Sequence, residues 1–353
     1  MRSMSYAVGL LTTTLLSLTT ASPSAKPSAP SLLLPVTELR SFGGNTWAEN
    51  VAIRSNGQLL VTRFDTPILQ LLDPTNKTAP ITLHTFNTTR YSGLTGIAET
   101  TPGSDIFYVG LQTPTTALLI KSTNFSNAIF KVDLNNFSSK ANSIVSAPTI
   151  SHIIDIPESM LINGMSALDS EHILIADSTL GQVYNLDVSI PSYTTPLKPP
   201  SMGAPPNASS PIGINGIHYL SPYLYFDSLA ASTLNRIPIA PITALPIGDS
   251  VLLANVAGPD DFAIREDGTI FLCGNGKNTL FMWKEGMSEA VAVAGSNTST
   301  VLASVTAAAF EKVGGREGNR LWLTTGGVQT QSINGTISVG VGATVSYVDT
   351  ECI

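Results

Sequence analysis

One pattern recurs six times along the chain, and this repeat constrains the fold more than any other feature. In its clearest copy, Gly258–Gly274, two acidic residues precede a short apolar run, a Glu-Asp-Gly turn and a second apolar run. Two short strands joined by an Asp-Gly turn are typical of a β-hairpin. The copies follow one another at intervals of about 45 to 65 residues. Each has a polar residue where its first apolar run begins, and we call these six residues the repeat heads: Glu49, Thr95, Asn163, Asn215, Asp260 and Thr306.

Each repeat head is followed by two or three short apolar runs with no helical spacing between them. Third runs occupy residues 68–72, 128–132, 182–186, 233–237 and 280–283. Three or four short strands per repeat are typical of a propeller blade. The sequence therefore predicts an all-β fold, a six-bladed β-propeller formed as a single domain by residues 33–353.

The two ends of the predicted propeller must meet, because an open ring would expose an unpaired strand edge. Residues 33–42 predict a strand, and we expect it to close the ring beside the C-terminal segment 341–350. Residues 113–127 form a polar insertion in the second repeat. The Pro- and Ser-rich stretch 190–213 predicts a surface loop or a flap over one mouth of the propeller, since proline cannot join a strand ladder along such a length.

The N-terminus has the layout of a cleavable signal peptide, which we assign to residues 1–21. A basic Arg2 precedes an apolar run at 7–18, and small residues follow. The run is too short to cross a bilayer, so no membrane span is predicted. Residues 22–32 form a Pro/Ser linker. These features predict a secretory-pathway or extracellular protein.

Composition agrees with secretion and excludes some partners. Only 12% of residues are charged, and seven N-x-S/T sequons predict a glycoprotein whose glycans supply solubility. The net charge of −7 argues against nucleic acid as a partner. Cys273 and Cys352 either form one bridge or remain a buried thiol and a terminal one. We expect a monomer. The sequon asparagines are Asn76, Asn87, Asn124, Asn136, Asn207, Asn297 and Asn334.

The repeat heads are the candidate functional residues, because the innermost strands of a propeller begin around one mouth of its channel. Four heads carry oxygen ligands that suit a hard divalent cation: Glu49, Asn163, Asn215 and Asp260. Each could instead accept N–H groups of the turn before its strand. Apolar residues near the heads are candidates for binding a hydrophobic substrate, or for packing between blades. They are Trp47, Tyr91, Met165, Phe262 and Phe310.

The segments around four heads resemble the metal-binding positions of the six-bladed senescence-marker-protein/gluconolactonase family of lactone hydrolases. These segments are WAENV (47–51), LINGM (161–165), GINGI (213–217) and GPDDF (258–262). The resemblance implies that Glu49, Asn163, Asn215 and Asp260 are catalytic and hold Ca²⁺ or another divalent cation, with Asp260 as general base. The chain departs from the family where Asp261 replaces glycine and where Asn50-Val51 replaces Gly-Pro. A bulkier side chain at these positions could move a ligand out of register.

A narrower resemblance is to the secreted fungal branch of this superfamily, which includes the hetero-Diels-Alderases of tropolone-sesquiterpenoid biosynthesis. It is carried by LTGIAE (94–99), INGM (162–165) and PDDFA (259–263), together with the signal peptide and the sequons. It implies a secreted pericyclase of secondary metabolism that joins a tropolone-type o-quinone methide to a humulene-type alkene, giving a meroterpenoid, with no cofactor required. Two alternatives stay open. One is a metal-dependent lactonase, and the other is a propeller that binds a small molecule without catalysis.

Overall fold

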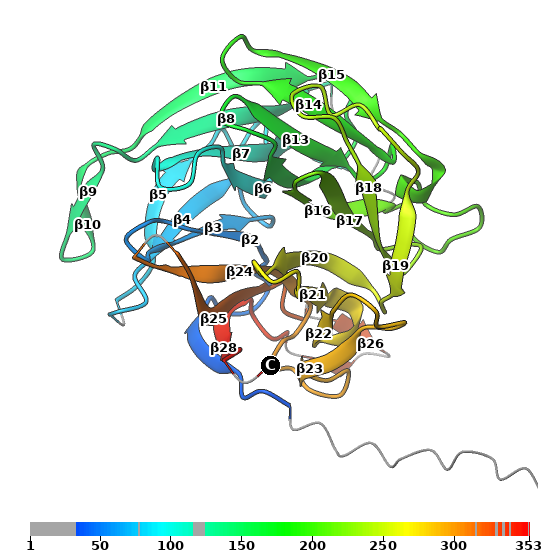
Figure 1. The fold of residues 1–353 in the computed structure, drawn as a ribbon. Helices are drawn as coiled ribbons and strands as arrows, with labels where there is room; N and C mark the ends of the chain where they lie inside the picture. Colours follow the sequence, from blue (N-terminus) through cyan, green and yellow to red (C-terminus); the bar gives the residue numbers. More distant parts are fainter. Residues whose placement is uncertain are drawn as a thin grey trace, which may run out of the picture. The chain divides into compact units, whose positions relative to one another are not determined.

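The chain folds as an all-β, six-bladed propeller, as its repeats predicted. The computed structural model describes residues 33–353 except 77, 116–123, 315, 329–330, 334–335, 339 and 352. Six four-stranded antiparallel sheets stand in a ring around a central axis (Figure 1), and we call the space between their innermost strands the channel. The helical content of the described part is two short 3-10 helices, η1 (Pro200–Met202) and η2 (Asn275–Lys277). No helix within it is long and apolar enough to cross a membrane.

Each blade begins with an innermost strand at the channel, and its later strands lie successively farther out. Blade one contains β2 (Ala48–Ile53), β3 (Leu59–Arg63), β4 (Ile68–Leu72) and β5 (Ile81–Thr85), and blade two contains β6 (Gly93–Glu99), β7 (Ile106–Gln112), β8 (Asn127–Asp133) and β11 (Thr149–Ile156). Blade three contains β12 (Ile162–Ala167), β13 (His172–Asp177), β14 (Gln182–Asp187) and β15 (Ser192–Leu197), and blade four contains β16 (Ile214–Leu220), β17 (Tyr223–Ser228), β18 (Thr233–Pro238) and β19 (Val251–Asn255).

Blade five contains β20 (Pro259–Ile264), β21 (Ile270–Gly274), β22 (Thr279–Trp283) and β23 (Val291–Gly295), and blade six contains β24 (Val305–Val313), β25 (Arg316–Thr325), β28 (Thr344–Asp349) and β1 (Thr37–Ser41). Two small hairpins stand apart from the blades, β9 (Ser138–Lys140) with β10 (Ser143–Ser146) and β26 (Gln331–Ile333) with β27 (Thr336–Ser338).

The ring is closed by the N-terminal strand, as expected from the need to cover an edge. β1 pairs antiparallel with β28, from Thr37 opposite Tyr347 to Ser41 opposite Thr344. The strand is shorter than the predicted segment 33–42, because Leu34 and Val36 precede it and pack against the apolar cluster of blades five and six. The last blade is therefore built from both ends of the described chain.

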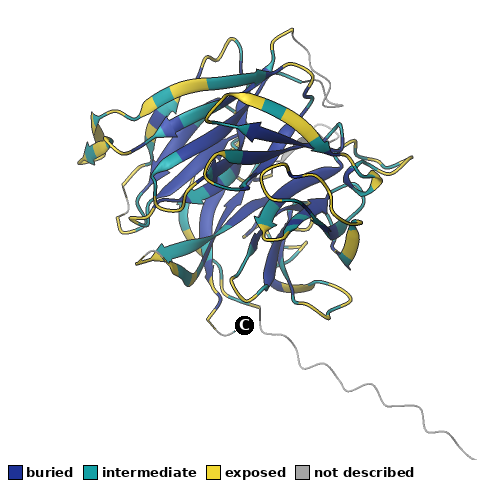
Figure 2. Cartoon of the chain, turned by 45° about the horizontal axis from the view of Figure 1, so that its top comes forward, coloured by how far each residue is buried: buried dark blue, intermediate teal, exposed yellow. Residues whose placement is uncertain are grey.

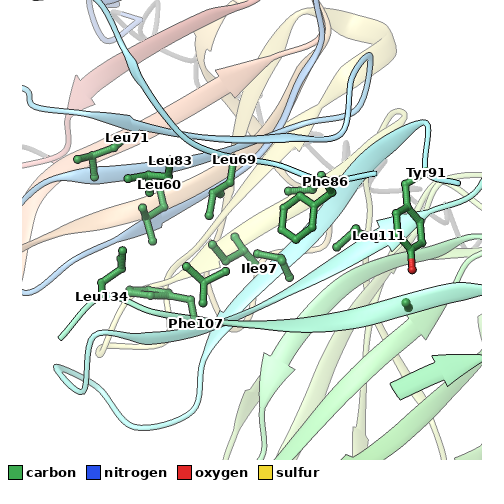
Figure 3. Packing of buried hydrophobic residues seen from close by; sticks show 14 residues of the cluster. Leu60, Leu69, Leu71, Leu83, Phe86, Tyr91, Ile97, Phe107, Leu111 and Leu134 are labelled. Carbon is green, nitrogen blue, oxygen red and sulfur yellow. The ribbon is translucent and has the colours of Figure 1, made fainter. Parts of the chain in front are cut away.

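Apolar clusters between neighbouring blades hold the propeller together. Leu60 and Leu69 of blade one pack against Ile97 and Phe107 of blade two (Figure 3). The strands near the channel are buried and the outer strands are partly exposed (Figure 2). For example, every residue of β3 is buried, whereas only Leu83 of β5 is buried. Exposed positions are expected where one face of an antiparallel sheet meets solvent.

The Pro/Ser-rich stretch 190–213 is not a loop along its whole length, which corrects the sequence prediction. Residues Ser192–Leu197 form β15, the outermost strand of blade three. An edge strand tolerates Pro196, since its missing N–H can face away from the ladder. Met202 of η1 is fully buried between blades three and four, so this segment is anchored in the core. Of the predicted insertion 113–127, residues 116–123 lie outside the described residues.

The sequons that the structure describes are accessible at the surface. The asparagines at positions 76, 87, 124, 136, 207 and 297 are all exposed. Asn334, Cys352, the predicted signal peptide and the predicted linker lie outside the described residues. Glycosylation and secretion therefore stay predictions.

All six innermost strands are bulged at their repeat heads. The pairing with the second strand shifts register within 48–51, 94–97, 162–165, 214–217, 259–262 and 305–307. A bulge bends the strand and changes the direction of a side chain. The repeated bulge therefore gives the six heads equivalent positions, although their side chains differ.

Glycines directly after three heads let neighbouring innermost strands approach closely. A Cβ atom at Gly164 would lie 2.5 Å from the carbonyl oxygen of Asn215 and 2.8 Å from the backbone nitrogen of Ile217. A Cβ at Gly96 would lie 2.3 Å from the carbonyl oxygen of Asn163. Backbone atoms of a closed ring cannot move aside easily, so glycine is required there.

We predict that Gly164→Ala lowers the free energy of unfolding by about 1–3 kcal/mol, the usual cost of overpacking a core. Gly203→Ala is the matched control, because its Cβ would find its nearest atom, the carbonyl oxygen of Pro200, at 3.6 Å. Urea unfolding of both variants measures the effect. Equal stability of Gly164→Ala and the wild type would contradict the close strand approach.

Candidate functional site

The four oxygen-bearing heads lie at the beginning of innermost strands around the channel. Glu49, Asn163, Asn215 and Asp260 each occupy the second position of their strand, in β2, β12, β16 and β20. Successive innermost strands contact one another around the ring (Figure 1). All four side chains are largely buried, with at most 9% of the residue exposed. Glu49, Asn215 and Asp260 interact with one another as a largely buried polar group, and Asn163 occupies the equivalent position in blade three.

Asp260 is the most strongly hydrogen-bonded member of the group. One of its carboxyl oxygens accepts a 2.6 Å hydrogen bond from the Nδ2 of Asn215, and the other accepts one of 2.6 Å from the Nδ2 of Asn275. Burial raises the pKa of Asp260 well above its usual value, and the negative charge of Glu49 adds to the effect. The two amides oppose this shift because they stabilise the carboxylate.

Asn275 is a site residue that the repeat pattern missed. It is the first residue of η2, which follows the second strand of blade five, and every residue singled out by the pattern lies near a first strand. The sequence signal available was Gly274-Asn275-Gly276, a short turn with no partner visible in the sequence. In the folded blade η2 lies beside the head of β20, and this contact brings the amide of Asn275 to Asp260.

Glu49 is held by a neighbour that was predicted as a substrate contact. A carboxyl oxygen of Glu49 accepts a hydrogen bond from the indole Nε1 of Trp47. Burial raises the pKa of Glu49 to about 7, the Trp47 hydrogen bond opposes the shift, and the charge of Asp261 adds to it. The indole of Trp47 lies directly against Gly326, where a Cβ would come within 2.7 Å of the ring. Trp47 is therefore a rigid support at the edge of the site.

Asn50 and Asp261, two residues that depart from the family pattern, are hydrogen-bonded to each other. Asp261 accepts a 2.9 Å hydrogen bond from the Nδ2 of Asn50, which joins blade five to blade one. Its other carboxyl oxygen lies 3.2 Å from the Nε2 of His218. β20 keeps the same bulge as the other innermost strands, so Asp261 does not displace Asp260 from its register. Residues larger than glycine are accommodated here because Asn50 and Asp261 are complementary.

A further acidic residue, Asp227, lies beneath the heads and was not predicted. It is on β17, opposite the bulge of β16, and is completely buried. Neither carboxyl oxygen has a hydrogen-bond partner among the described residues. Burial raises its pKa well above the usual value, with added repulsion from Asp261 and Asp260 and only partial opposition from the nearby Gly216 N–H. The repeat pattern does not indicate Asp227, because the pattern places polar residues at the start of first strands and Asp227 lies on a second strand.

The two threonine heads have structural roles. The Oγ1 of Thr306 donates to the carbonyl oxygen of Ala48 at 2.8 Å and so ties blade six to blade one. The Oγ1 of Thr95 faces the carbonyl oxygen of Gly110 within its own blade. By contrast, the amide of Asn163 has no hydrogen-bond partner within the described part of the chain, so it can bind a ligand.

The five predicted substrate contacts do not converge. Trp47 reaches the site through Glu49. Tyr91, Met165 and Phe262 are buried in the apolar clusters between blades, and Phe262 is completely buried. Phe310 lies toward the far end of β24, with the guanidinium of Arg265 stacked 5.0 Å from its ring centre.

The donor chemistry of the site suits a hard divalent cation to a limited degree. Glu49 and Asp260 supply two carboxyl groups, and the charge of Glu49 contributes to the raised pKa of Asp260. Asn215 supplies an amide beside Asp260. Oxygen donors of this kind are the usual ligands of Ca²⁺. No group of three or more His, Cys, Asp or Glu side chains in the described residues is arranged to hold a metal ion. A cation would therefore depend on the amides and on water.

Comparison with known proteins gives two kinds of similarity. No family model matches the sequence. The chain is 25% identical over 307 residues to a Phoma sp protein named "Putative hetero-Diels-Alderase", covering 80% of this chain and 85% of that protein. It is 25% identical over 258 residues to "Putative hetero-Diels-Alderase asR5" from Sarocladium schorii. That match covers 66% of this chain and 61% of the relative, less than two thirds of its length.

Solved structures share the fold at low sequence identity. A luciferin-regenerating enzyme has a TM-score of 0.61 at 13% identity, over 90% of this chain and 96% of that one. Regucalcin from Agrobacterium tumefaciens, a calcium-binding protein, has a TM-score of 0.55 at 13% identity, over 88% of this chain and 95% of that one. The chain thus shares its propeller fold with these structures, and its resemblance in sequence to hetero-Diels-Alderases is confirmed.

Proposed function

We propose that the chain is a secreted pericyclase that joins a tropolone-type o-quinone methide to a humulene-type alkene. The observation that carries the proposal is the buried polar group formed by Glu49, Asn215 and Asp260 at the heads of neighbouring innermost strands. The similarity to two proteins named as hetero-Diels-Alderases supports a pericyclase at the family level. The identity of both reactants is part of the proposal.

The reaction needs polarisation and positioning more than proton transfer. In the cycloaddition, the methide carbon bonds to one alkene carbon while the quinone oxygen bonds to the other, and no atom leaves. Hydrogen bonds to the quinone oxygen make the heterodiene more electrophilic as charge builds on that oxygen. Asn163 has a free amide for this purpose, and a carboxyl whose pKa is raised by burial remains protonated and donates a hydrogen bond. Glu49, with a pKa of about 7, is such a group in mildly acidic solution.

Holding both reactants together supplies a large part of the acceleration. An intermolecular cycloaddition loses translational and rotational freedom, and a bound pair in a reactive orientation avoids that loss at the moment of reaction. In this proposal the four polar heads fix the oxygenated reactant, and Trp47 at the edge of the site contacts the hydrocarbon.

The test uses purified full-length protein with an o-quinone methide generated in situ and humulene as the alkene. We expect product formation well above the spontaneous rate and one product stereoisomer in excess. Treatment with EDTA, or addition of Ca²⁺, should leave both readouts unchanged. A product rate and isomer ratio equal to the protein-free reaction would refute the proposed activity.

A metal-dependent lactonase is the second candidate, and the proximity of Glu49, Asp260 and Asn215 favours it specifically. These residues would hold the cation, which would polarise a lactone carbonyl while Asp260 activates water. Hydrolysis of a lactone that is lost with EDTA and regained with Ca²⁺ would support this function. The same EDTA treatment therefore separates the two candidates.

A further inference from the structure

We propose a second small-molecule site, distinct from the channel mouth, in a cavity of about 520 Å³ between blades three and four. Its walls come from β13, β14 and β15 of blade three and from Ile242, Thr243 and Leu245, which lie between β18 and β19 in blade four. None of its lining residues belongs to the group of repeat heads. A concave site of this volume is in the usual range for small organic ligands.

The blade-four wall is held in a strained conformation. Ile242 has a φ of 68°, in the left-handed region where a β-branched residue is a genuine outlier. Its side chain is nevertheless 60% exposed and lines the cavity, so it does not gain compensating burial in the core. A strained residue persists only when surrounding contacts fix it, and such residues cluster at ligand sites.

Two contacts fix Ile242 in this conformation. The Nδ2 of Asn185 donates a 2.7 Å hydrogen bond to the carbonyl oxygen of Ile242, which joins the two blades across the cavity. Ile239 pairs with Pro246 and closes the loop at its base. Asn185 is buried, with 6% of the residue exposed, and its Oδ1 has no partner in the part of the chain that the structure describes. If Asn185 served only to pack the core, an apolar side chain would suffice and would leave no amide oxygen without a partner.

The blade-three wall supplies an oriented polar group. The Nδ1 of His172 lies 2.9 and 3.0 Å from the two carboxyl oxygens of Asp169. A carboxylate accepts hydrogen bonds, so Nδ1 carries the proton and the Nε2 of a neutral ring is left as an acceptor. Nε2 has no partner among the described residues, and His172 lines the cavity. A hydroxyl group in the cavity can therefore donate to a histidine that Asp169 holds in place.

The lining predicts the class of ligand. Tyr193, Ile242 and Leu245 provide apolar surface, and His172 provides a hydrogen-bond acceptor. Further polar lining comes from the carboxyl group of Asp187 and from the hydroxyl groups of Ser192, Thr194, Thr195 and Thr243. Leu245 is 54% exposed, so it too leaves apolar surface uncovered. The site thus suits a compact, largely apolar molecule that carries a hydroxyl group, such as a bicyclic phenol or a terpenoid alcohol.

The test measures binding of 1-naphthol to the full-length protein by its fluorescence, with menthol as a competitor. We expect saturable binding that menthol reverses. Ile242→Gly should weaken it about tenfold through loss of apolar contact, and should raise the melting temperature because glycine relieves the left-handed strain. Leu245→Ala, at an exposed position that leaves the fold intact, should weaken binding several-fold.

Two matched variants control for binding elsewhere. Leu220→Ala changes another exposed leucine of blade four, and Asp260→Asn changes the channel site. Both should bind 1-naphthol as the wild type does. The proposal is overturned by the absence of saturable binding, by unchanged affinity in Ile242→Gly and Leu245→Ala, or by loss of affinity in Asp260→Asn, which would place the ligand in the channel.

Discussion

Replacing Asp260 with asparagine is expected to slow the cycloaddition by about 10²- to 10³-fold, the usual cost of losing one preorganised polar group at a reacting oxygen. Asp260 lies at the centre of the site, between the amides of Asn215 and Asn275. The substitution keeps the shape of the side chain but removes the carboxyl group. In the variant, one of the two neighbouring amide N–H groups faces the new N–H group of residue 260 instead of an acceptor oxygen. That neighbouring side chain must therefore rotate. The site then loses both a titratable donor and the present orientation of either Asn215 or Asn275.

The fold should tolerate this change, because it removes a negative charge that burial and Glu49 already disfavour. We expect an unchanged or higher melting temperature together with the loss of rate. Asp267→Asn is the matched control, since the same substitution then falls in the exposed turn of the same hairpin. A rate for Asp260→Asn equal to that of Asp267→Asn would show that the repeat heads do not act in the reaction. If Asp260→Asn lowers the melting temperature but its folded fraction reacts at the wild-type rate, Asp260 has a structural role.

The repeat architecture was predictable because blades are local hairpins. Each innermost strand and its partner are joined by a short turn such as Glu266-Asp267-Gly268, so the relevant pattern lies within one stretch of sequence. Closure by β1 was predictable for a different reason, since a ring with an open edge would expose unpaired backbone groups. β15 was missed because its Pro196 suggests a loop, and only its place at the edge of a sheet makes that proline acceptable.

The functional site was predictable only in part. The repeat heads could be listed from the sequence because they share one position in each repeat. Asn275 and Asp227 could not, because their importance depends on which blades become neighbours. The hydrogen bond between Asn50 and Asp261 shows the same limit: each residue is a departure from the family pattern, and only the closed ring reveals that the two are complementary. Contacts between distant repeats carry this information, and a single repeat does not contain it.

Replacing Asp227 with asparagine should stabilise the protein at neutral and alkaline pH. The wild-type carboxyl is fully buried without a partner among the described residues, and leaving a buried polar group unsatisfied costs about 1–3 kcal/mol, more if it is charged. Its pKa in the folded protein is raised well above the ordinary 3.8. Below the ordinary value the group is protonated in both the folded and unfolded states. As pH rises above it, the unfolded chain ionises first, so the folded state of the wild type loses stability relative to the variant.

Urea titration at several pH values measures the free energy of unfolding of both proteins and tests whether the advantage of the variant grows as pH rises. The advantage of Asp227→Asn should be near zero below about pH 4 and reach about 1–3 kcal/mol at about pH 8. Asp187→Asn gives a control of opposite sign, since hydrogen bonds from the Ser189 hydroxyl and the Ile190 N–H lower the pKa of Asp187. That variant should lose stability relative to the wild type as pH rises. If Asp227→Asn is less stable than the wild type in the alkaline range, the carboxylate must make favourable contacts in the channel, and a bound cation becomes the better explanation for keeping it there.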